Sequence, residues 1–320
     1  MSLDPAVAAA RRAVRRVLAG LEPGTVVMVA CSGGADSLAL LAATVAEARA
    51  ESLQVIGATV DHGLQDGSAD RAAHVVAQMA TLGADETVSA RVQVEGGGLG
   101  PEAAARTARY AVLDEIAERV GAALVLLGHT RDDQAETVLL GLARGSGGRS
   151  IAGMRRGFER YRRPFLDLAR AETRTACEAD GIAWWDDPHN DDPAYLRSRV
   201  RTRVLPVLEA ELGPGVAATL ARSADQLRGD MELLDDLAEG ELGRLDGLPV
   251  DGLLALPPPI RTRVLRLAAL ETGAPASELF HEHVLAVDAL LTDWHGQKWI
   301  ELPGHLRVVR RDGGLVFDRP

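Results

Sequence analysis

The stretch Ser-Gly-Gly-Ala-Asp-Ser, residues 32–37, has the clearest chemical pattern in this sequence. It separates two apolar runs, which predict a buried strand before it and a buried helix after it. A strand-to-helix turn of small residues exposes backbone N–H groups at a helix N-terminus, where an anion is favoured. The two glycines let the backbone approach a phosphate, and the two serines offer hydroxyl donors. The candidate phosphate-binding residues are Ser32, Gly33, Gly34, Ala35, Asp36 and Ser37.

Carboxylates form the second chemical pattern. Asp36 would lie beside a bound polyanion, which is reasonable mainly when Mg²⁺ lies between them. Within LLGHTRDDQAET, residues 126–137, a helix that begins near Asp132 places Asp133 and Glu136 on one face. Carboxylates crowded beside a phosphate site need a cation, which is a metal, an amine substrate or both. The alternative is an ordinary acidic first turn, which the helix dipole favours.

Arginines form the third pattern, although the net charge of −11 argues by itself against a nucleic-acid partner. Seven arginines lie between residues 144 and 163. Trp184, Trp185 and Tyr195 precede Arg197–Arg203, in which every second residue is arginine. Aromatic rings next to arginines suit stacking on unpaired bases and contacts to phosphates. The alternatives are tryptophans in the core and arginines paired with carboxylates in solvent.

A further charged face is predicted in the helix that begins after Pro101. Glu102, Arg106 and Arg109 are spaced so that they share one side of that helix. The residues would either serve a site or form a solvated salt-bridge ladder worth tenths of a kcal/mol.

The elements that must position these residues alternate between strands and helices. Strands without polar interruptions, separated by helices, are typical of a mostly parallel sheet covered on both faces, in a doubly wound α/β fold. Ligands of such a fold bind at the carboxyl ends of the strands, where the polar loops of this chain fall. Strands are predicted at 25–30, 53–60, 87–94 and 122–128, and helices at 37–50, 69–82, 102–120 and 133–143.

The second half of the chain has a different pattern. Residues 145–192 are rich in loops, with one helical run near 166–180, and amphipathic helices follow Pro193. Residues 297–318 alternate and turn at two glycine-containing pairs, which predicts a small β-hairpin or meander. We therefore expect a first domain over 1–195, which contains the chemical motifs, and a smaller, mainly helical domain over 196–320.

Composition excludes several classes of protein. Cys31 and Cys177 are far apart, which argues against a disulfide scaffold, a zinc ribbon or a thiol-relay enzyme. Lys298 is the only lysine, so neither a Walker loop nor a Schiff base has a residue to use in the N-terminal half. The sequence shows neither a signal-peptide pattern nor a run of about twenty apolar residues, so we expect a cytoplasmic protein without a membrane partner.

The residues 32–37 in this strand–helix context resemble the PP-loop family of ATP pyrophosphatases. The ordered set of motifs resembles one branch of it, the tRNA(Ile)-lysidine synthetase family, from Val26 to about Leu208. The matching motifs are Ser32–Ser37, Asp61-His62-Gly63-Leu64, Glu102-x3-Arg106-x2-Arg109-Tyr110, Gly128-His129-x2-Asp132-Asp133-Gln134-x-Glu136-Thr137, Arg144–Gly147, Met154, Arg163-Pro164 and Asp187-x2-Asn190.

The resemblance implies a reaction with ATP, Mg²⁺, free L-lysine and a tRNA(Ile) with a CAU anticodon. ATP adenylates carbon 2 of the wobble cytidine, and the ε-amine of lysine then displaces AMP. The implied catalytic residues are Asp36, Asp133, Glu136 and Arg109, and Asp36 and Asp133 are the implied Mg²⁺ ligands. His62 and His129 join residues 32–37 at ATP. The implied substrate-binding residues are Asp133 and Glu136 for lysine, and Arg106, Arg144, Arg197 and Arg201 for tRNA. The resemblance also implies that residues 1–195 form the ATP-binding catalytic domain and residues 196–320 a tRNA-binding domain.

Two other functions remain open from the sequence. The first is another PP-loop tRNA-modifying enzyme, although a thiolase would require a cysteine pair near the site. The second is an RNA-binding relative that has lost catalysis, although the intact loop and acidic motif argue against it. The sequence is compatible with a homodimer and does not decide the oligomeric state.

Overall fold

The computed structural model describes residues 3–61, 67–92, 101–145, 147–190 and 192–319, with the backbone only for 101–106 and His189. By Cα packing the chain forms two compact units. Unit 1 contains residues 1–140 and 153–222, and unit 2 contains 141–152 and 223–320. These units do not follow chain order, since the segment 141–152 belongs to unit 2 and residues 153–222 belong to unit 1. Residues just after 195 make hydrogen bonds to Glu136 and Asp133 in unit 1. The division into domains over 1–195 and 196–320 stays a prediction.

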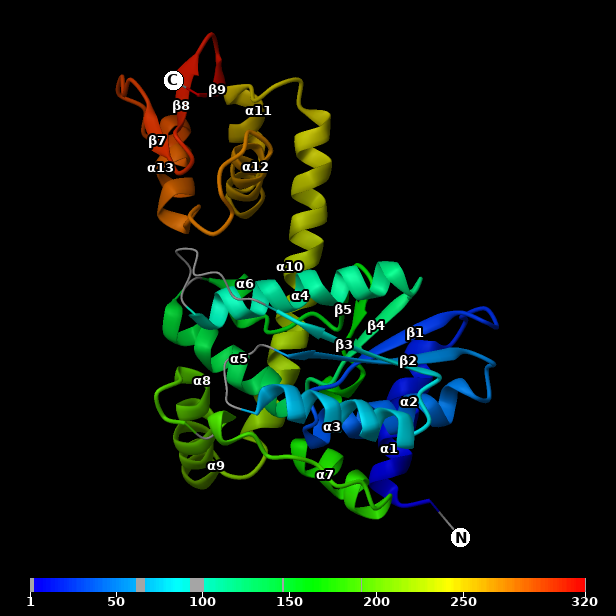
Figure 1. Ribbon diagram of the computed structural model, residues 1–320. Helices are drawn as coiled ribbons and strands as arrows, with labels where there is room; N and C mark the ends of the chain where they lie inside the picture. Colours follow the sequence, from blue (N-terminus) through cyan, green and yellow to red (C-terminus); the bar gives the residue numbers. More distant parts are fainter. Residues whose placement is uncertain (1–2, 62–66, 93–100, 146, 191, 320) are drawn as a thin grey trace. The chain divides into compact units, whose positions relative to one another are not determined.

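A six-stranded sheet organises unit 1, in the order β3-β2-β1-β4-β6-β5 (Figure 1). All neighbouring pairs are parallel except β5 with β6. The predicted doubly wound, mostly parallel sheet is therefore confirmed. The strands are β1 (Val26–Ala30), β2 (Gln54–Asp61), β3 (Glu86–Arg91), β4 (Leu124–Leu127), β5 (Gly157–Phe158) and β6 (Tyr161–Arg162).

Helices cover both faces of this sheet because its strands are apolar on both sides (Figure 1). In β1, Val27 and Val29 belong to one buried cluster, and Met28 between them belongs to the other. The first cluster includes residues of α1, α2, α3 and α7, and the second includes residues of α4. These helices are α1 (Pro5–Leu18), α2 (Ala35–Ala48), α3 (Ser68–Thr81), α4 (Pro101–Arg119) and α7 (Arg170–Ala179).

The region predicted to be rich in loops contains short elements that no periodicity could reveal. Strands β5 and β6 have two residues each, which is too short for an alternating pattern. The predicted helical run 166–180 is divided into a 3₁₀ turn, η1 (Pro164–Asp167), and α7. Two further short elements are α6 (Gly148–Ile151) and η2 (Pro188–Asn190).

A helical segment with an irregular middle follows the sheet. It consists of α8 (Leu196–Arg199), a π-helical stretch η3 (Val200–Val204) and α9 (Leu205–Leu212). Pro206 explains the irregular stretch, because proline cannot donate the backbone hydrogen bond to the residue four positions earlier. Arg197 precedes η3 and Arg201 lies inside it. Both side chains donate hydrogen bonds to the carboxylate of Glu136, in α5 (Arg131–Arg144).

Unit 2 has a core of its own, built from helices and a three-stranded antiparallel sheet β7-β8-β9. This confirms the predicted mainly helical C-terminal part, and its meander over residues 297–318. The helices are α10 (Val216–Arg244), of which the part from residue 223 on belongs to unit 2, α11 (Val250–Ala255), α12 (Pro258–Glu271) and α13 (His281–Thr292). The strands are β7 (Ile300–Leu302), β8 (Leu306–Arg311) and β9 (Gly314–Asp318).

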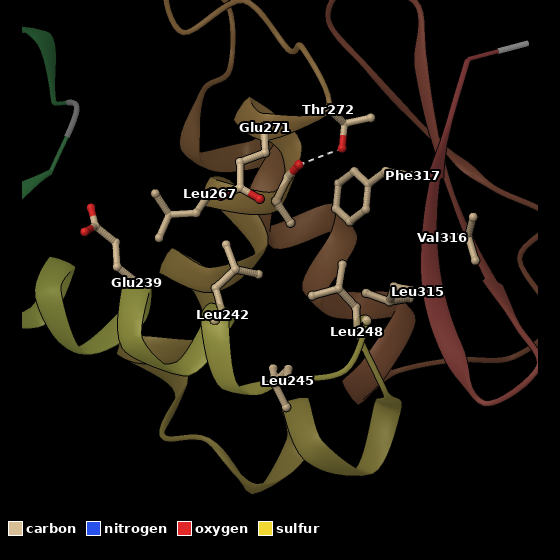
Figure 2. Close-up of a pocket in the computed structure, with 13 residues that line it drawn as sticks. Glu239, Leu242, Leu245, Leu248, Leu267, Glu271, Thr272, Leu315, Val316 and Phe317 are labelled. Atoms are coloured by element: carbon tan, nitrogen blue, oxygen red, sulfur yellow. Dashed lines mark hydrogen bonds between the residues drawn. The ribbon is translucent and has the colours of Figure 1, made fainter.

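A groove of about 710 Å³ lies within unit 2. Figure 2 shows it between α10, α12 and β9, with leucine side chains along its walls and Glu239 and Glu271 among its lining residues. None of the predicted site residues lines it. An open groove of leucines with two carboxylates has no group suited to hold a phosphate, so the chemistry must be sought in unit 1.

A search of the described residues for membrane spans found no single helix that is long and apolar enough. One bent pair, Leu196–Leu212 with Val216–Arg244 at 99°, meets the criterion together on length and composition only.

Candidate active site

The predicted loops meet where the strand order of the sheet reverses direction. Strands β1 and β4 are parallel neighbours, with Ala30 beside Leu127, and their connections leave toward opposite sides of the sheet. Ligands of such sheets bind in the crevice at this point. The backbone of Gly128 is so close that a Cβ added there would lie 3.1 Å from the backbone of Asp36. The loop after β1 and the loop after β4 therefore form one site.

The loop of residues 32–37 has the geometry of an anion cradle at the N-terminus of α2. Gly33 has a φ of +84°, a conformation that L side chains rarely adopt, and a Cβ there would meet Val75 at 2.7 Å. The Ser37 hydroxyl donates to the Gly34 carbonyl at 2.9 Å and accepts the Ser32 N–H at 3.1 Å. These contacts shape the loop from within, so its backbone can approach a phosphate without rearranging.

A tryptophan and an arginine hold this loop from outside. The backbone N–H of Trp185 donates to the Gly33 carbonyl at 3.0 Å. The guanidinium of Arg71, from α3, lies 3.1 Å from the centre of the Trp185 ring. Gln78 of the same helix donates to the Ala183 carbonyl at 2.7 Å. Arg71 thus covers one face of the Trp185 ring. This contact helps to fix Trp185, whose backbone N–H in turn holds the Gly33 carbonyl of the loop.

We expect Trp185→Ala to raise the KM for ATP about tenfold and to leave kcat within about twofold, since a cation–π contact contributes about 0.5–2 kcal/mol. The readout is ATP–pyrophosphate exchange. Arg71→Gln removes the cationic partner of the same contact and should raise the KM for ATP by a similar factor. If Arg71→Gln leaves the KM for ATP unchanged while Trp185→Ala raises it, the contact between them does not support the loop.

Beside the cradle, three carboxylates surround the guanidinium of Arg170, the first residue of α7. One of its terminal nitrogens lies 2.8 Å from Asp133 Oδ1 and 3.4 Å from Glu136 Oε1. Its Nε lies 3.6 Å from Asp36 Oδ2. Thr173, one turn later in α7, donates to Asp36 Oδ1. A guanidinium therefore lies where the sequence predicted a metal or an amine.

Two more guanidiniums reach the same carboxylates. Glu136 has no exposed surface, and it accepts Arg197 Nε at 3.0 Å and Arg201 Nε at 2.7 Å. Arg201 also reaches Asp133 Oδ1 at 3.3 Å, and Arg197 donates to the Thr137 hydroxyl at 2.8 Å. The predicted phosphate contacts Arg197 and Arg201 are thus turned toward carboxylates in this structure, and their role at tRNA stays a prediction.

The carboxylates of the site differ in their proton affinity. The pKa of Asp36 is raised from 3.8 to about 6, mainly by burial and also by the nearby Asp133, against the opposing effects of Thr173 and Arg170. Burial would also raise the pKa of Asp133, but Arg170, His129 and the Thr130 N–H outweigh it and hold this pKa well below its ordinary value. Asp133 is therefore an ionised charge partner, whereas Asp36 can gain a proton close to neutral pH.

Other members of the acidic motif position the site. Asp132 accepts the backbone N–H of Arg170 at 2.8 Å and so ties the start of α7 to α5. Gln134 makes two hydrogen bonds with the backbone of Met154, at 2.6 and 3.1 Å. His129 accepts Arg163 Nε at its Nδ1 at 3.2 Å, which leaves Nε2 as the nitrogen that carries the proton of a neutral ring.

The structure does not bring the remaining predicted residues into contact with the carboxylate cluster, or does not describe their side chains. Arg109 is exposed on α4, and Arg144 is exposed at the end of α5. Arg106 lies in α4, but its side chain falls outside the described residues, as does the whole of His62. Their predicted roles at ATP and tRNA stay predictions.

Both cysteines are unsuited to sulfur chemistry. Cys31 and Cys177 are free and buried, and burial raises the pKa of each thiol to about 12. Each is therefore a neutral thiol at physiological pH.

Known proteins similar to this chain point to one family. A model described as a PP-loop domain matches residues 8–208, and a model described as the TilS substrate binding domain matches residues 248–316. The tRNA(Ile)-lysidine synthase of Thermobifida fusca is 54% identical over 98% of this chain and 97% of its own length. That of Streptomyces coelicolor is 51% identical over 100% of this chain and 99% of its own.

The chain belongs to the tRNA(Ile)-lysidine synthase family. The predicted resemblance is thereby confirmed, and this family's loop and acidic motif are the ones that meet at the reversal of the sheet. A solved U34-tRNA thiolase, NcsA from Methanococcus maripaludis, covers 69% of this chain and 79% of its own with a TM-score of 0.58. At 18% identity this likeness shows a shared fold alone.

Sequence reasoning missed Arg170 and Thr173, whose side chains reach Asp133, Glu136 and Asp36 from α7. The only signal was their spacing of three in a short amphipathic helix, which places them on one face. Because many arginines and threonines are spaced in this way, the pattern could not single them out.

Proposed function

We propose that this chain forms lysidine at the wobble cytidine of a CAU-anticodon tRNA(Ile), as the family name of its relatives indicates. ATP adenylates carbon 2 of the base, and the ε-amine of free L-lysine then displaces AMP. The anticodon changes from reading AUG to reading AUA. The enzyme is an ATP-dependent ligase that uses tRNA as a substrate.

The observation that carries this proposal is the pairing of two sites at one sheet edge. The cradle of residues 32–37 suits the pyrophosphate of ATP, and the neighbouring cluster contains both carboxylates and guanidiniums. Free lysine carries ammonium and carboxylate groups, so this cluster offers partners to both ends of it. Because Arg170, Arg197 and Arg201 already bond to Asp133 and Glu136, the ammonium can reach these carboxylates only if a guanidinium releases one of them.

Lysine must lose a proton before its amine attacks. A proton acceptor works best when its pKa lies near the operating pH. In the site without Mg²⁺, Asp36, whose pKa burial raises to about 6, fits that role better than Asp133, whose pKa is held low. We assign Asp133 to charge recognition, and Glu136, which bonds to the same guanidiniums, to positioning them.

Mg²⁺ belongs to the proposal through ATP. Among the described residues, no three His, Cys, Asp or Glu side chains gather in a way that could hold a metal. Mg²⁺ commonly binds one or two carboxylates together with substrate phosphates and water, so Asp36 beside the cradle fits it as a single ligand. The ion would supply charge neutralisation at the phosphates.

The test is incorporation of labelled lysine into tRNA in the presence of ATP and Mg²⁺. We expect label in a CAU-anticodon tRNA(Ile), and none in the same tRNA with the wobble cytidine changed to uridine. Label in both tRNAs, or in neither while ATP–pyrophosphate exchange proceeds, would contradict lysidine formation. Either result would favour another PP-loop tRNA-modifying activity. A homodimer stays a prediction, which light scattering can check.

A further inference from the structure

Arg163 lies at the carboxyl end of β6, next to the end of β4 that leads into His129. The register of these two parallel strands pairs Leu126 with Arg162, so Arg163 and His129 both follow the last paired position. Arg163 is only 5% exposed. Arginine is rarely buried so completely unless its charged group has partners. A buried guanidinium at the sheet edge that forms the site therefore needs a structural or functional reason.

Hydrogen bonds from each of its nitrogens fix the direction of this guanidinium. The Nε of Arg163 donates to Nδ1 of His129 at 3.2 Å. One terminal nitrogen donates to the Tyr110 hydroxyl at 3.1 Å, and the other donates to the Arg155 carbonyl at 2.6 Å. Because these bonds leave from one rigid plane, the guanidinium cannot turn without breaking at least one of them. Arg163 is thus placed to hold the ring of His129.

Aromatic packing holds Tyr110, which accepts one of these bonds. Its ring centre lies 5.0 Å from that of Tyr161 and 6.0 Å from that of Phe158. Tyr161 is 1% exposed, and its hydroxyl donates at 2.8 Å to Asp114, which lies in α4 as Tyr110 does. The guanidinium carbon of Arg163 lies 5.0 Å from the centre of the Phe158 ring. The packing of α4, β5 and β6 therefore sets the position of Arg163.

The bond at Nδ1 decides which nitrogen of His129 is the donor. An arginine nitrogen can only donate, so Nδ1 accepts and the N–H of the ring is at Nε2, on the side away from Arg163. His129 follows Gly128, where an added Cβ would lie 3.1 Å from the backbone of Asp36. His129 also helps to keep the pKa of Asp133 low. The ring that carries this donor therefore lies beside both the cradle and the carboxylates.

We propose that Arg163 is a positioning residue of this ligase, which holds His129 in the orientation and tautomer that let Nε2–H donate to a phosphate oxygen of ATP. A charged phosphate oxygen is a strong hydrogen-bond acceptor. In the opposite tautomer Nε2 would present a lone pair, which repels such an oxygen. The proposal deepens the proposed function and rests on it, since it takes ATP as the ligand of the cradle.

The first experiment measures the Kd of ATP for the full chain by calorimetry. We expect His129→Ala and Arg163→Met each to weaken ATP binding about tenfold, because each removes or misdirects one hydrogen bond to a charged oxygen. The double variant should bind about as weakly as His129→Ala alone, since Arg163 acts through the ring. Arg162→Met is the matched control, because Arg162 donates to the carbonyls of Glu159 and Tyr161, and it should change the Kd by less than about twofold.

The second experiment observes the ring itself. The ¹⁵N chemical shifts of an imidazole distinguish its two tautomers, and the spectrum of His129→Ala identifies the signals of this residue. We expect the Nε2–H pattern in the wild type and the loss of that single pattern in Arg163→Met. Arg163→Lys keeps a donor and should retain more of the pattern. Tyr110→Phe removes one acceptor of Arg163 and should weaken ATP binding less than about threefold.

Three results would each overturn the proposal: additive losses of ATP affinity in the double variant, an unchanged tautomer in Arg163→Met, or normal ATP binding by His129→Ala. Urea unfolding shows whether each variant is folded. If Arg163→Met does not fold, Arg163→Lys and Tyr110→Phe decide the question by the same two measurements. If the wild-type chain binds ATP through His129 but incorporates no lysine, the proposed function fails and the positioning of His129 by Arg163 stands.

Discussion

Glu136→Gln should lower the free energy of unfolding by about 3 kcal/mol and reduce lysine incorporation at least a hundredfold. Glu136 is fully buried and bonds to Arg197 and Arg201, with Arg170 at 3.4 Å. Removing one partner of a buried ion pair costs about 3–5 kcal/mol because the other charges lose their compensation. We expect the lower end of that range, since the three guanidiniums keep 20–27% of their side-chain surface exposed.

Urea unfolding followed by circular dichroism measures this loss, and labelled lysine measures the activity. Glu118→Gln is the matched control in the same unit, because Glu118 is 72% exposed and pairs with Arg160 at 3.8 Å. It should change the free energy of unfolding by less than about 0.5 kcal/mol. The double variant Glu136→Gln/Arg201→Met should recover part of the stability without recovering activity. If Glu136→Gln is as stable as the wild type, the guanidiniums do not depend on this carboxylate.

The fold could be predicted because its signals are local and repeated. Strands β1, β2 and β4 are short and largely apolar, and each is followed by a longer helical stretch, so length and hydrophobicity identify them. The observed α2, at 35–48, and α4, at 101–119, lie within two residues of their predicted bounds. Strands β5 and β6 were missed because two residues carry no period.

The sequence could predict which loops of the site lie together, because the sheet places them, but not which side chains pair within it. The loop at 32–37 and the motif at 128–137 were predicted to meet because they follow strands of one sheet, and the structure confirms that juxtaposition. What the sequence could not show is which charges pair. Arg170, Arg197 and Arg201 converge on Glu136 from two segments far from it in sequence, and pairing at such separations depends on tertiary packing.

The contact of Trp185 with Arg71 could not be predicted for the same reason, because the two residues are far apart in sequence. Its neighbours in sequence suggested either stacking on RNA or burial in the core, and both readings ignored Arg71, which lies far away in the chain. The structure places Arg71 over the ring, so the ring takes part in supporting the ATP loop. By contrast, Trp294 and Trp299 keep their exposed area, although each also has an arginine over its ring. Exposure, and not the presence of an arginine, therefore distinguishes the half-buried Trp185 from Trp294 and Trp299.

Asp36→Asn should abolish turnover and at the same time stabilise the ligand-free protein at neutral pH. The pKa of Asp36 is raised from 3.8 to about 6 on folding, so the folded state holds the proton more tightly than the unfolded state. The stability from this group is fully present below about pH 4 and is lost as the pH rises through about 6. Above that pH the buried charge opposes folding, and an uncharged asparagine does not.

The expected gain at pH 7.5 is about 1–2 kcal/mol, below the roughly 3 kcal/mol that two pH units represent, because part of the Asp36 side chain contacts water. The amide keeps an oxygen that can accept from Thr173, so the packing of α7 against α2 is retained. The gain should shrink to nothing below about pH 4, where Asp36 is protonated in both states. Urea unfolding of both proteins at pH 7.5 and pH 4 checks this.

Turnover should fall at least a hundredfold in Asp36→Asn, because the asparagine can neither accept the proton of lysine nor hold Mg²⁺ at the phosphates. Binding of tRNA should stay within about twofold, since Asp36 lies in the cradle and its contacts are with Thr173 and Arg170. A variant that is more stable, inactive and still binds tRNA would mean that this carboxylate is retained for chemistry at a cost in stability. A variant that unfolds more easily at pH 7.5, or that turns over normally, would contradict that assignment. A wild-type chain that binds tRNA tightly without turnover would instead favour the RNA-binding relative that has lost catalysis.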